Sequence, residues 1–315
     1  MTDYKNLKLI ATSNPHIRGS ETTRSIMLDV IIAMCPALIW AIIYFGVEAL
    51  LLTVVSVVGC VFFEWAYRKI MHKPQSIGDL SAVVTGMLLA FVCPATTPLW
   101  MILIGDFFAI IVVKQLFGGI GKNFANPALV GRIVLFLSFS KTMTAWVFPD
   151  AVSSATPLAQ LAAGQKPELW TLLLGNHGGC IGETCALALL LGGAYLLLRG
   201  VITWQTPVCF VGTVFVLSLI LGQDAVRQIL SGGLLLGAFF MATDYVTSPV
   251  TKKGQLIFGL GCGLITVFIR YFGSYPEGVC YSILVMNCCT WIIDKYTKPT
   301  RFGVDKKAAK EAAKK

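Results

Sequence analysis

Long apolar runs dominate this sequence and restrict its fold more than any other feature. A helix that crosses the hydrocarbon core of a bilayer needs about 17–25 mostly apolar residues. Only 13% of the 315 residues are charged, about half the share found in soluble domains. Runs of this kind, some of them short, lie at 26–45, 50–65, 99–113, 187–198, 208–221, 256–272 and 279–293. The sequence therefore predicts an all-α polytopic membrane protein.

Lysine and arginine are distributed unequally between the segments that join the apolar elements. About ten elements are predicted, at 26–45, 48–66, 80–93, 98–115, 128–140, 183–198, 206–222, 229–243, 255–272 and 278–294. With the N-terminus in the cytoplasm, 21 of the 25 basic residues face the cytoplasm and four face the other side. The positive-inside rule therefore predicts an even number of crossings of a bacterial cytoplasmic membrane, with both termini cytoplasmic. The net charge of +9 thus indicates orientation rather than nucleic-acid binding.

Two sequence patterns of the first half recur in the second half, and both are displaced along the chain by nearly the same number of residues. Leu80–Pro94 and Leu230–Asp244 both begin with Leu-Ser and break at a polar or proline-containing turn, and Asn126-Pro-Ala is echoed by Tyr275-Pro-Glu. Five elements per half is an odd number, so the halves are predicted to insert in opposite orientations, as in many transporters. The predicted regions are a cytoplasmic segment (1–25), a five-helix repeat (26–140), an extracytoplasmic loop (141–182), a second five-helix repeat (183–294) and a basic cytoplasmic tail (295–315).

The N-terminal segment, the basic tail and the cysteines carry no specific functional motif. The first 25 residues lack the pattern of a cleaved signal peptide, so the first apolar run is expected to act as an uncleaved anchor. The basic tail is expected to be attracted to the surface of the membrane lipid. The ten cysteines include no CxxC pair and mostly lie in apolar runs, where free cysteine packs as a small hydrophobe. No metal site is expected.

A polar stretch within the predicted extracytoplasmic loop carries the most specific motif. Residues 150–156 read DAVSSAT and resemble the acceptor motif for covalent flavinylation: Asp, two variable residues, Ser or Thr, usually Gly, then Ala-Thr. The resemblance implies that a flavin transferase joins FMN to Thr156 through a phosphoester bond. The other motif positions are Asp150, Ser153, Ser154, where Gly is usual, and Ala155. Thr156 is expected in an exposed loop, with Pro157 ending any helix there, and its replacement by Ala is expected to cost less than about half a kcal/mol.

Three stretches of the sequence resemble signature sequences of the RnfD/NqrB family. They are Phe117–Ala128, Ser153–Leu158 and Phe240–Pro249, and the resemblance extends over nearly the whole chain. It implies ten helices in two inverted five-helix halves, as in urea transporters. It also implies a subunit of the Rnf complex, an ion-pumping ferredoxin:NAD⁺ oxidoreductase, with RnfA, RnfB, RnfC, RnfE and RnfG as partners. NqrB-like proteins suggest riboflavin as a second flavin.

Two acids inside apolar elements are candidates for function, because a carboxylate in hydrocarbon is costly and usually faces a cavity or a partner. Asp106 lies in the middle of LWMILIGDFFAIIVVK, and Asp244 ends a short broken element close to Thr247 and Ser248. Both are candidates for an ion path or for a contact with a buried flavin. Other acids, Glu183 among them, lie near predicted ends, where solvation at the membrane interface explains them.

Alternative functions remain open at this stage. A solute channel or carrier with the same inverted repeats, a structural anchor for redox partners and an NqrB-like subunit of a quinone reductase are the competing hypotheses. The motif at 150–156 separates a flavoprotein from a solute carrier, which has no use for a flavin acceptor. The sequence shows no nucleotide-binding domain and no iron–sulfur motif, so the chain is expected to act as one subunit of a translocase. The translocated ion, Na⁺ or H⁺, is left open.

Overall fold

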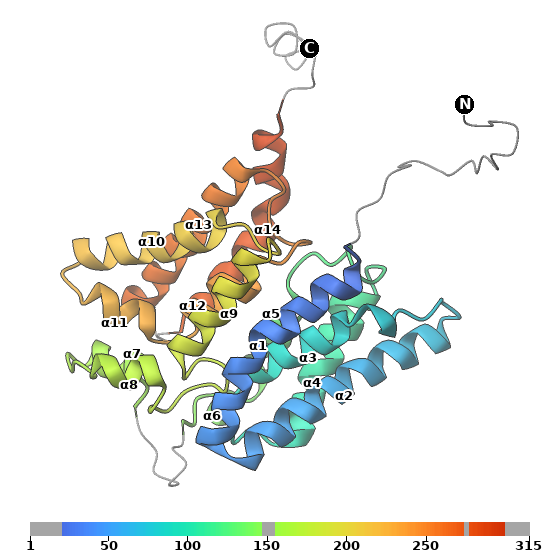
Figure 1. Ribbon diagram of the computed structural model, residues 1–315, viewed down its shortest axis with the longest axis horizontal. Helices are drawn as coiled ribbons and strands as arrows, with labels where there is room; N and C mark the ends of the chain where they lie inside the picture. The colour runs from blue at the N-terminus through green and yellow to red at the C-terminus, as the bar shows by residue number, and fades with distance from the viewer. Residues whose placement is uncertain (1–20, 147–154, 274–276, 300–315) are drawn as a thin grey trace, which may run out of the picture.

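The computed structural model describes residues 21–146, 155–273 and 277–299, and all regular structure within these ranges is helical (Figure 1). This confirms the predicted helical class. Three of the described helices, α1 (Thr23–Phe45), α2 (Val47–Ile70) and α13 (Lys252–Phe272), are long and apolar enough to cross a membrane. The number of crossings and the inverted repeat stay predictions.

The first half of the chain alternates long helices with short ones. After α1 and α2 come η2 (Ile77–Asp79), α3 (Ser81–Phe91), α4 (Leu99–Phe107), the π-helical segment η3 (Phe108–Gln115) and α5 (Pro127–Ser138). Gly46, with φ of 75°, separates α1 from α2, since glycine adopts positive φ readily. Asn126 caps α5 by accepting a hydrogen bond from the Ala128 amide, and Pro127 occupies the first helical position, where proline is tolerated.

Three short helices join the halves, and the second half repeats the mixture of long and short elements. The joining helices are α6 (Ser140–Met143), α7 (Pro157–Ala162) and α8 (Leu169–Leu174). The second half comprises α9 (Ala186–Leu198), α10 (Gln205–Ile220), α11 (Ala225–Leu230), α12 (Leu234–Leu236), the π-helical η4 (Gly237–Met241), α13 and α14 (Val279–Thr297). The range predicted as one element at 98–115 is α4 continued by a π-helix, which apolar periodicity does not reveal.

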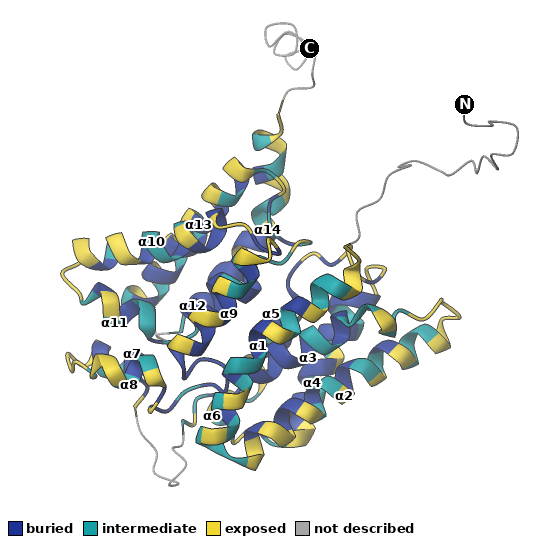
Figure 2. Ribbon diagram, viewed as in Figure 1, coloured by how far each residue is buried: buried dark blue, intermediate teal, exposed yellow. Residues whose placement is uncertain are grey.

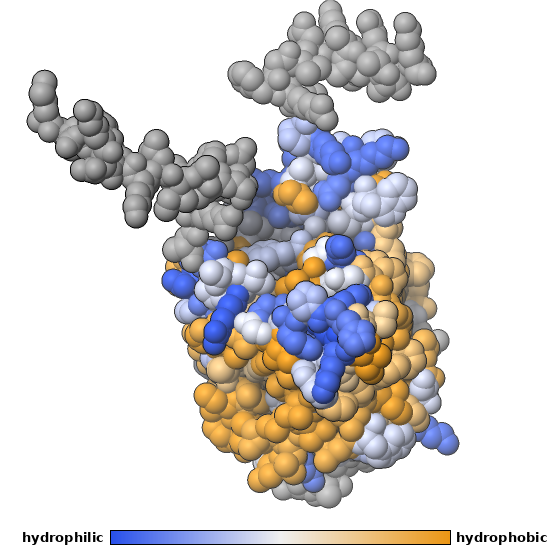
Figure 3. Space-filling view, turned by 90° about the vertical axis from the view of Figure 1, so that its right-hand side faces the viewer, coloured by the Kyte–Doolittle hydropathy of each residue, from blue (hydrophilic) through white to orange (hydrophobic). Residues whose placement is uncertain are grey.

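The two halves pack together through a few central helices. α1 packs against α9, and α5 packs against α14. The short elements α3, α12 and η4 carry mostly buried residues, whereas α2 and α10 expose apolar side chains on their outer faces (Figure 2). Figure 3 shows one largely apolar face of the molecule, with polar residues gathered toward its upper part. This distribution suits a protein whose outer helices face lipid.

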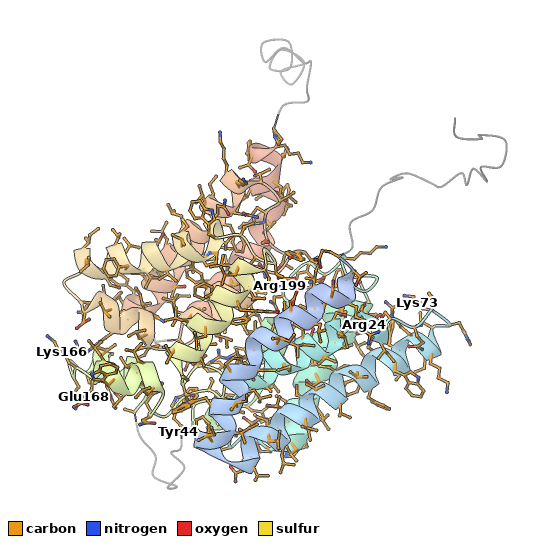
Figure 4. The ribbon with its side chains drawn as sticks, viewed as in Figure 1. Arg24, Tyr44, Lys73, Lys166, Glu168 and Arg199 are labelled. Atoms are coloured by element: carbon orange, nitrogen blue, oxygen red, sulfur yellow. The ribbon has the colours of Figure 1, made fainter. Side chains whose placement is uncertain are left out.

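The joining helices lie at the opposite end of the molecule from the first turn of α1 and the last turn of α14 (Figure 1). In Figure 4, Arg24 and Lys73 lie on the right and Arg199 near the centre, while Lys166 and Glu168 mark the α7–α8 corner on the left. The end that carries α6, α7 and α8 is called the α7 end below.

Candidate functional site

Thr156, the proposed attachment residue of the flavinylation motif, lies within the described part of the chain. Its side chain is buried, with 7% of the residue exposed, and its Oγ accepts a hydrogen bond of 3.3 Å from the Ala159 amide. Thr156 therefore caps α7, and Pro157 begins this helix instead of ending one. The expectation of an exposed loop was wrong, because Thr156 is buried at the first turn of a helix whose Leu158 contacts Gly232 of the second half. Ala155 is exposed, whereas Asp150, Ser153 and Ser154 lie outside the described residues.

The segment after Thr156 rests on a tight turn between α11 and α12. Gly232 in this turn has φ of +66°, and a Cβ placed there would lie 2.5 Å from Leu158 Cδ1 and 3.3 Å from Arg270 Nη2. A Cβ on Gly233 would lie 2.5 Å from Glu183 Oε1. The two glycines thus let Leu158 of α7, Arg270 and Glu183 approach the same turn closely, and Leu158 is two residues from Thr156.

Four buried or half-buried charged residues meet beneath α7; they are called the charged cluster and are Arg132, Glu183, Arg270 and Glu277. Arg132 projects from α5 in the first half and pairs with Glu183 at 3.5 Å and with Glu277, both in the second half. Glu183 is held by the loop before α9, whose Gly182 amide donates to the Phe91 carbonyl of α3 at 2.8 Å. The charged cluster therefore ties the halves together, and Glu183 is not a residue solvated at the interface, as the sequence suggested.

Arg270 differs from Arg132 in its partners. It lies in the last turn of α13, with 8% of the residue exposed. Its guanidinium donates only to uncharged oxygens, namely the Gln228 carbonyl at 2.7 Å, the Gln228 amide oxygen at 3.2 Å and the Ser231 carbonyl at 3.1 Å. Within the described ranges, its buried Nε has no hydrogen-bond partner and no carboxylate lies within 4.0 Å.

A small cavity lies among these side chains, bounded also by Leu158 and Cys280. Its volume of about 10 Å³ is room for roughly one water molecule. Cys180, Glu183 and Glu277 place one potential metal-ligand atom each within 4.8 Å of the others. Arg132 already donates toward all three of these residues, so a guanidinium, rather than a metal ion, occupies the centre of this donor set.

Asp106 lies in α4, fully buried within the first half. Its Oδ1 lies 2.7 Å from Ser56 Oγ and 3.2 Å from Cys60 Sγ, and both groups come from α2. Its Oδ2 has no hydrogen-bond partner among the described residues. A Cβ on Gly59 would lie 2.7 Å from that oxygen, so the glycine makes room for the carboxyl group. The π-helix η3 begins two residues later, and such segments often occur at functional sites.

A larger cavity of about 290 Å³ lies between the halves, near the beginning of α1. Apolar side chains form most of its wall, including Phe239 and Phe240 of η4, while Lys114, Asn123 and Asp244 add polar groups. Asp244 is half-buried and accepts a hydrogen bond of 3.0 Å from Thr247 Oγ1. Asp106 does not line this cavity, so the two candidate acids from the sequence belong to different sites.

Lys114 is a buried functional candidate that the sequence patterns did not single out. Its Nζ lies 2.7 Å from Glu64 Oε2 and 2.6 Å from Ser81 Oγ. Arg132 and Arg270 were missed as well. A signal was present in the sequence for all three, because basic residues inside apolar runs are as costly as acids.

The fold and these sites define a class: a helical membrane protein whose two halves enclose buried charges at one end and a cavity toward the other. The family model described as "NQR2, RnfD, RnfE family" matches residues 10–303, and the chain belongs to this family.

Curated relatives resemble the chain over almost its full length. It is 49% identical to the D subunit of the Na⁺-translocating ferredoxin:NAD⁺ oxidoreductase complex of Acetobacterium woodii, covering 95% of this chain and 97% of the relative. It is 42% identical to the D subunit of the proton-translocating ferredoxin:NAD⁺ oxidoreductase complex of Clostridium ljungdahlii, with the same coverage. A third relative, the D subunit of the ion-translocating oxidoreductase complex of Actinobacillus succinogenes, is 36% identical, covering 93% of this chain and 97% of the relative.

Proposed function

We propose that this chain is the D subunit of an Rnf-type ion-translocating ferredoxin:NAD⁺ oxidoreductase complex and carries FMN joined to Thr156. Family membership and the names of the relatives support the first part. The observation that carries the second part is the stretch 150–156, which matches the acceptor motif at every specified position except Ser154. When attached, FMN supplies a carrier of one or two electrons.

The proposed complex supplies what this chain lacks. Its sequence has no nucleotide-binding domain and no iron–sulfur motif, so electrons have to reach it from other subunits, for which RnfA, RnfB, RnfC, RnfE and RnfG are proposed. A flavin transferase is proposed to load Thr156 from the extracytoplasmic side. The distribution of basic residues supports this orientation, with both termini cytoplasmic. The position of α7 opposite the first turn of α1 agrees with it.

The residues near Thr156 offer FMN an attachment point but no room for its ring. The threonine hydroxyl would supply the ester oxygen, and the charged cluster nearby is balanced, with two arginines and two glutamates. The cavity in the cluster has room for about one water molecule, so neither the phosphate nor the isoalloxazine ring would fit within it. This chain would contribute the attachment point through Thr156.

The larger cavity is proposed to bind the second flavin, riboflavin, without a covalent bond. Its volume of about 290 Å³ is close to the lower limit for small-molecule sites. Phe239 and Phe240 offer apolar contacts, and Asn123 and Asp244 offer hydrogen bonds to the polar edge of a flavin. A flavin that is released on denaturation while FMN stays attached would support this assignment, and its persistence after mutation of both phenylalanines to Ala would contradict it.

Asp106 is proposed to lie on the path of the translocated ion. Its carboxyl group is buried with one oxygen unpartnered among the described residues, as expected of a group that exchanges a proton or a cation. Relatives named for Na⁺ and for protons resemble the chain at 49% and 42% identity, so the proposal covers either ion. The inverted five-helix repeat is proposed as the framework, because short broken elements occupy the buried centre of both halves.

The test is the flavin content of the full chain produced with and without a flavin transferase. The wild type is expected to fluoresce in a denaturing gel and to gain the mass of FMN, only with the transferase. Thr156→Ala removes the ester oxygen and is expected to abolish both signals completely, while Thr171→Ala, on the neighbouring helix α8, leaves them unchanged. If the wild type stays free of flavin, a solute channel, or a structural anchor for redox partners, becomes the better assignment.

A further inference from the structure

A buried ion pair forms part of the wall of the larger cavity. Lys114 of η3 and Glu64 of α2 are 2% and 0% exposed, and Lys114 Nζ lies 2.7 Å from Glu64 Oε2. Lys114 lines the cavity of about 290 Å³, whereas Glu64 does not. Ionised groups are costly to bury in a membrane protein, and they commonly mark paths for ions or protons.

Hydrogen bonds extend this pair in two directions. On one side, Lys114 Nζ lies 2.6 Å from Ser81 Oγ, and the Ser81 hydroxyl donates to Asp79 Oδ1 at 2.6 Å. On the other side, the Ser76 hydroxyl donates to Glu64 Oε1. An unbroken series of hydrogen bonds therefore runs from Asp79 through Ser81, Lys114 and Glu64 to Ser76.

Both ends of this series reach the surface. Ser76 and Asp79 are half-buried, and they follow the exposed residues 71–75 in the segment between α2 and α3. Lys73, in the same segment, lies at the edge of the molecule in Figure 4. Protons from water can therefore enter the series at its ends, and Lys114 brings it to the cavity.

The charges along the series are balanced. Arg68 Nε lies 3.9 Å from Glu64 Oε1, so the cations of Lys114 and Arg68 face the carboxylates of Glu64 and Asp79. No charge is left over for binding an anion, and movement of a proton is the role that such a network suits. Other titratable groups on the elements around Lys114 make no hydrogen bond to it; they are Cys60 of α2, Asp106 of α4 and Asp244 in the wall of the cavity.

The ammonium group of Lys114 has a donor to spare. Two of its three N–H groups are taken by Glu64 and Ser81, and the third has no acceptor among the described residues. Buried lysines change their protonation readily and act as acids and bases, whereas arginine keeps its proton. The ring of a flavin takes up two electrons and two protons on full reduction, so a flavin in this cavity needs a source of protons.

We propose that Lys114 transfers protons to the flavin in the larger cavity and regains them from the surface through Ser81 and Asp79. The inference rests on the proposed function, which assigns a flavin to this cavity. In each transfer an N–H bond of Lys114 breaks and an N–H bond forms on the ring, while the electrons come from one-electron carriers in the other subunits. Lys114 then takes the hydroxyl proton of Ser81, which is replaced from water through the Asp79 carboxyl group. Glu64 positions the ammonium group.

The test follows proton uptake by the full chain, produced without the flavin transferase and loaded with riboflavin. A pulse of hydrated electrons reduces the ring, and the absorbance of the ring and of a pH-indicator dye is recorded together. Proton uptake by the wild type is expected to keep pace with reduction. Lys114→Met is expected to bind riboflavin but to slow proton uptake about a hundredfold. The matched control is Lys122→Met, which replaces an exposed lysine in the loop after η3 and should behave as the wild type.

Lys114→Arg separates transfer of a proton from the presence of a charge. Arginine keeps a cation beside Glu64 but does not release its proton. This variant is therefore expected to bind riboflavin and to show the same delay as Lys114→Met. Prompt proton uptake by either variant overturns the inference and leaves Lys114 as a structural cation.

Riboflavin binding, measured first by quenching of its fluorescence, keeps the inference apart from the proposed function. A wild type that binds no riboflavin removes the flavin from the cavity and the inference with it, whereas binding followed by prompt uptake in the variants removes the inference alone. If Lys114→Met does not fold because Glu64 loses its cation, Lys114→Met combined with Glu64→Gln leaves no charge in the pair, a change that buried pairs tolerate better. The same delay is expected of this double variant.

Discussion

Two buried acidic sites in this protein are built in opposite ways. In the charged cluster, Glu183 and Glu277 are both bonded to Arg132, which comes from the other half of the molecule. At the second site, Asp106 contacts Ser56 and Cys60 of its own half, and within the described residues no cation lies within 4.0 Å of it. Because a paired acid is fixed and an unpaired one can exchange its partner, the first arrangement suits assembly of the halves and the second suits ion transfer.

The contrast between the two sites predicts the largest loss of stability at the cluster. Arg132→Ala leaves the carboxylates of Glu183 and Glu277 without the cation that bonds to both, and breaking a buried pair in this way costs about 3–5 kcal/mol. Thermal unfolding of the detergent-solubilised chain should show the loss as a strongly lowered melting temperature. Arg199→Ala serves as the control, because this exposed arginine pairs with Asp29, which keeps a hydrogen bond from the Tyr195 hydroxyl when the arginine is removed, and the loss should be smaller. Equal effects of the two variants would remove the contrast between a buried and an exposed arginine.

A second prediction concerns Asp106. Asp106→Asn keeps the shape of the side chain and its contacts with Ser56 and Cys60 but removes its ability to carry a charge or a proton. Ion-coupled turnover of the assembled complex is expected to fall about tenfold or more, with covalent FMN and melting temperature near those of the wild type. The measurement is ion uptake into vesicles together with flavin fluorescence. Unchanged ion uptake would make Asp106 a structural residue.

The smallest predicted effect is on the helix cap. Thr156→Ala deletes the hydrogen bond from the Ala159 amide, and loss of such a cap costs typically about 1 kcal/mol. The flavin-free chain should therefore melt slightly earlier than the flavin-free wild type, and Thr156→Ser, which retains a hydroxyl, should melt close to it. Should Thr156→Ser lose as much as Thr156→Ala, packing of the methyl group, and not the cap, holds the residue.

Sequence patterns predicted the helices and the motif better than the contacts between distant segments. A single acid in an apolar run is visible along the chain, so Asp106 was identified directly. The charged cluster was not, because Arg132 lies 51 and 145 residues from its two partners, and no pattern along the chain brings them together. Thr156 was recognised from its motif, but no local pattern encodes its burial or the contact of Leu158 in α7 with the distant Gly232 turn.

The hydroxyl that caps α7 has a consequence for biogenesis. The same oxygen has to accept the Ala159 amide in the closed chain and be presented to a transferase during maturation, and a buried oxygen is a poor substrate. Attachment of FMN by the transferase and capping of α7 therefore compete for the same atom, Thr156 Oγ. A newly inserted chain whose first α7 turn is still open should be labelled faster than a chain that has already closed, so the order of events, as well as the motif, decides how much of the protein is loaded.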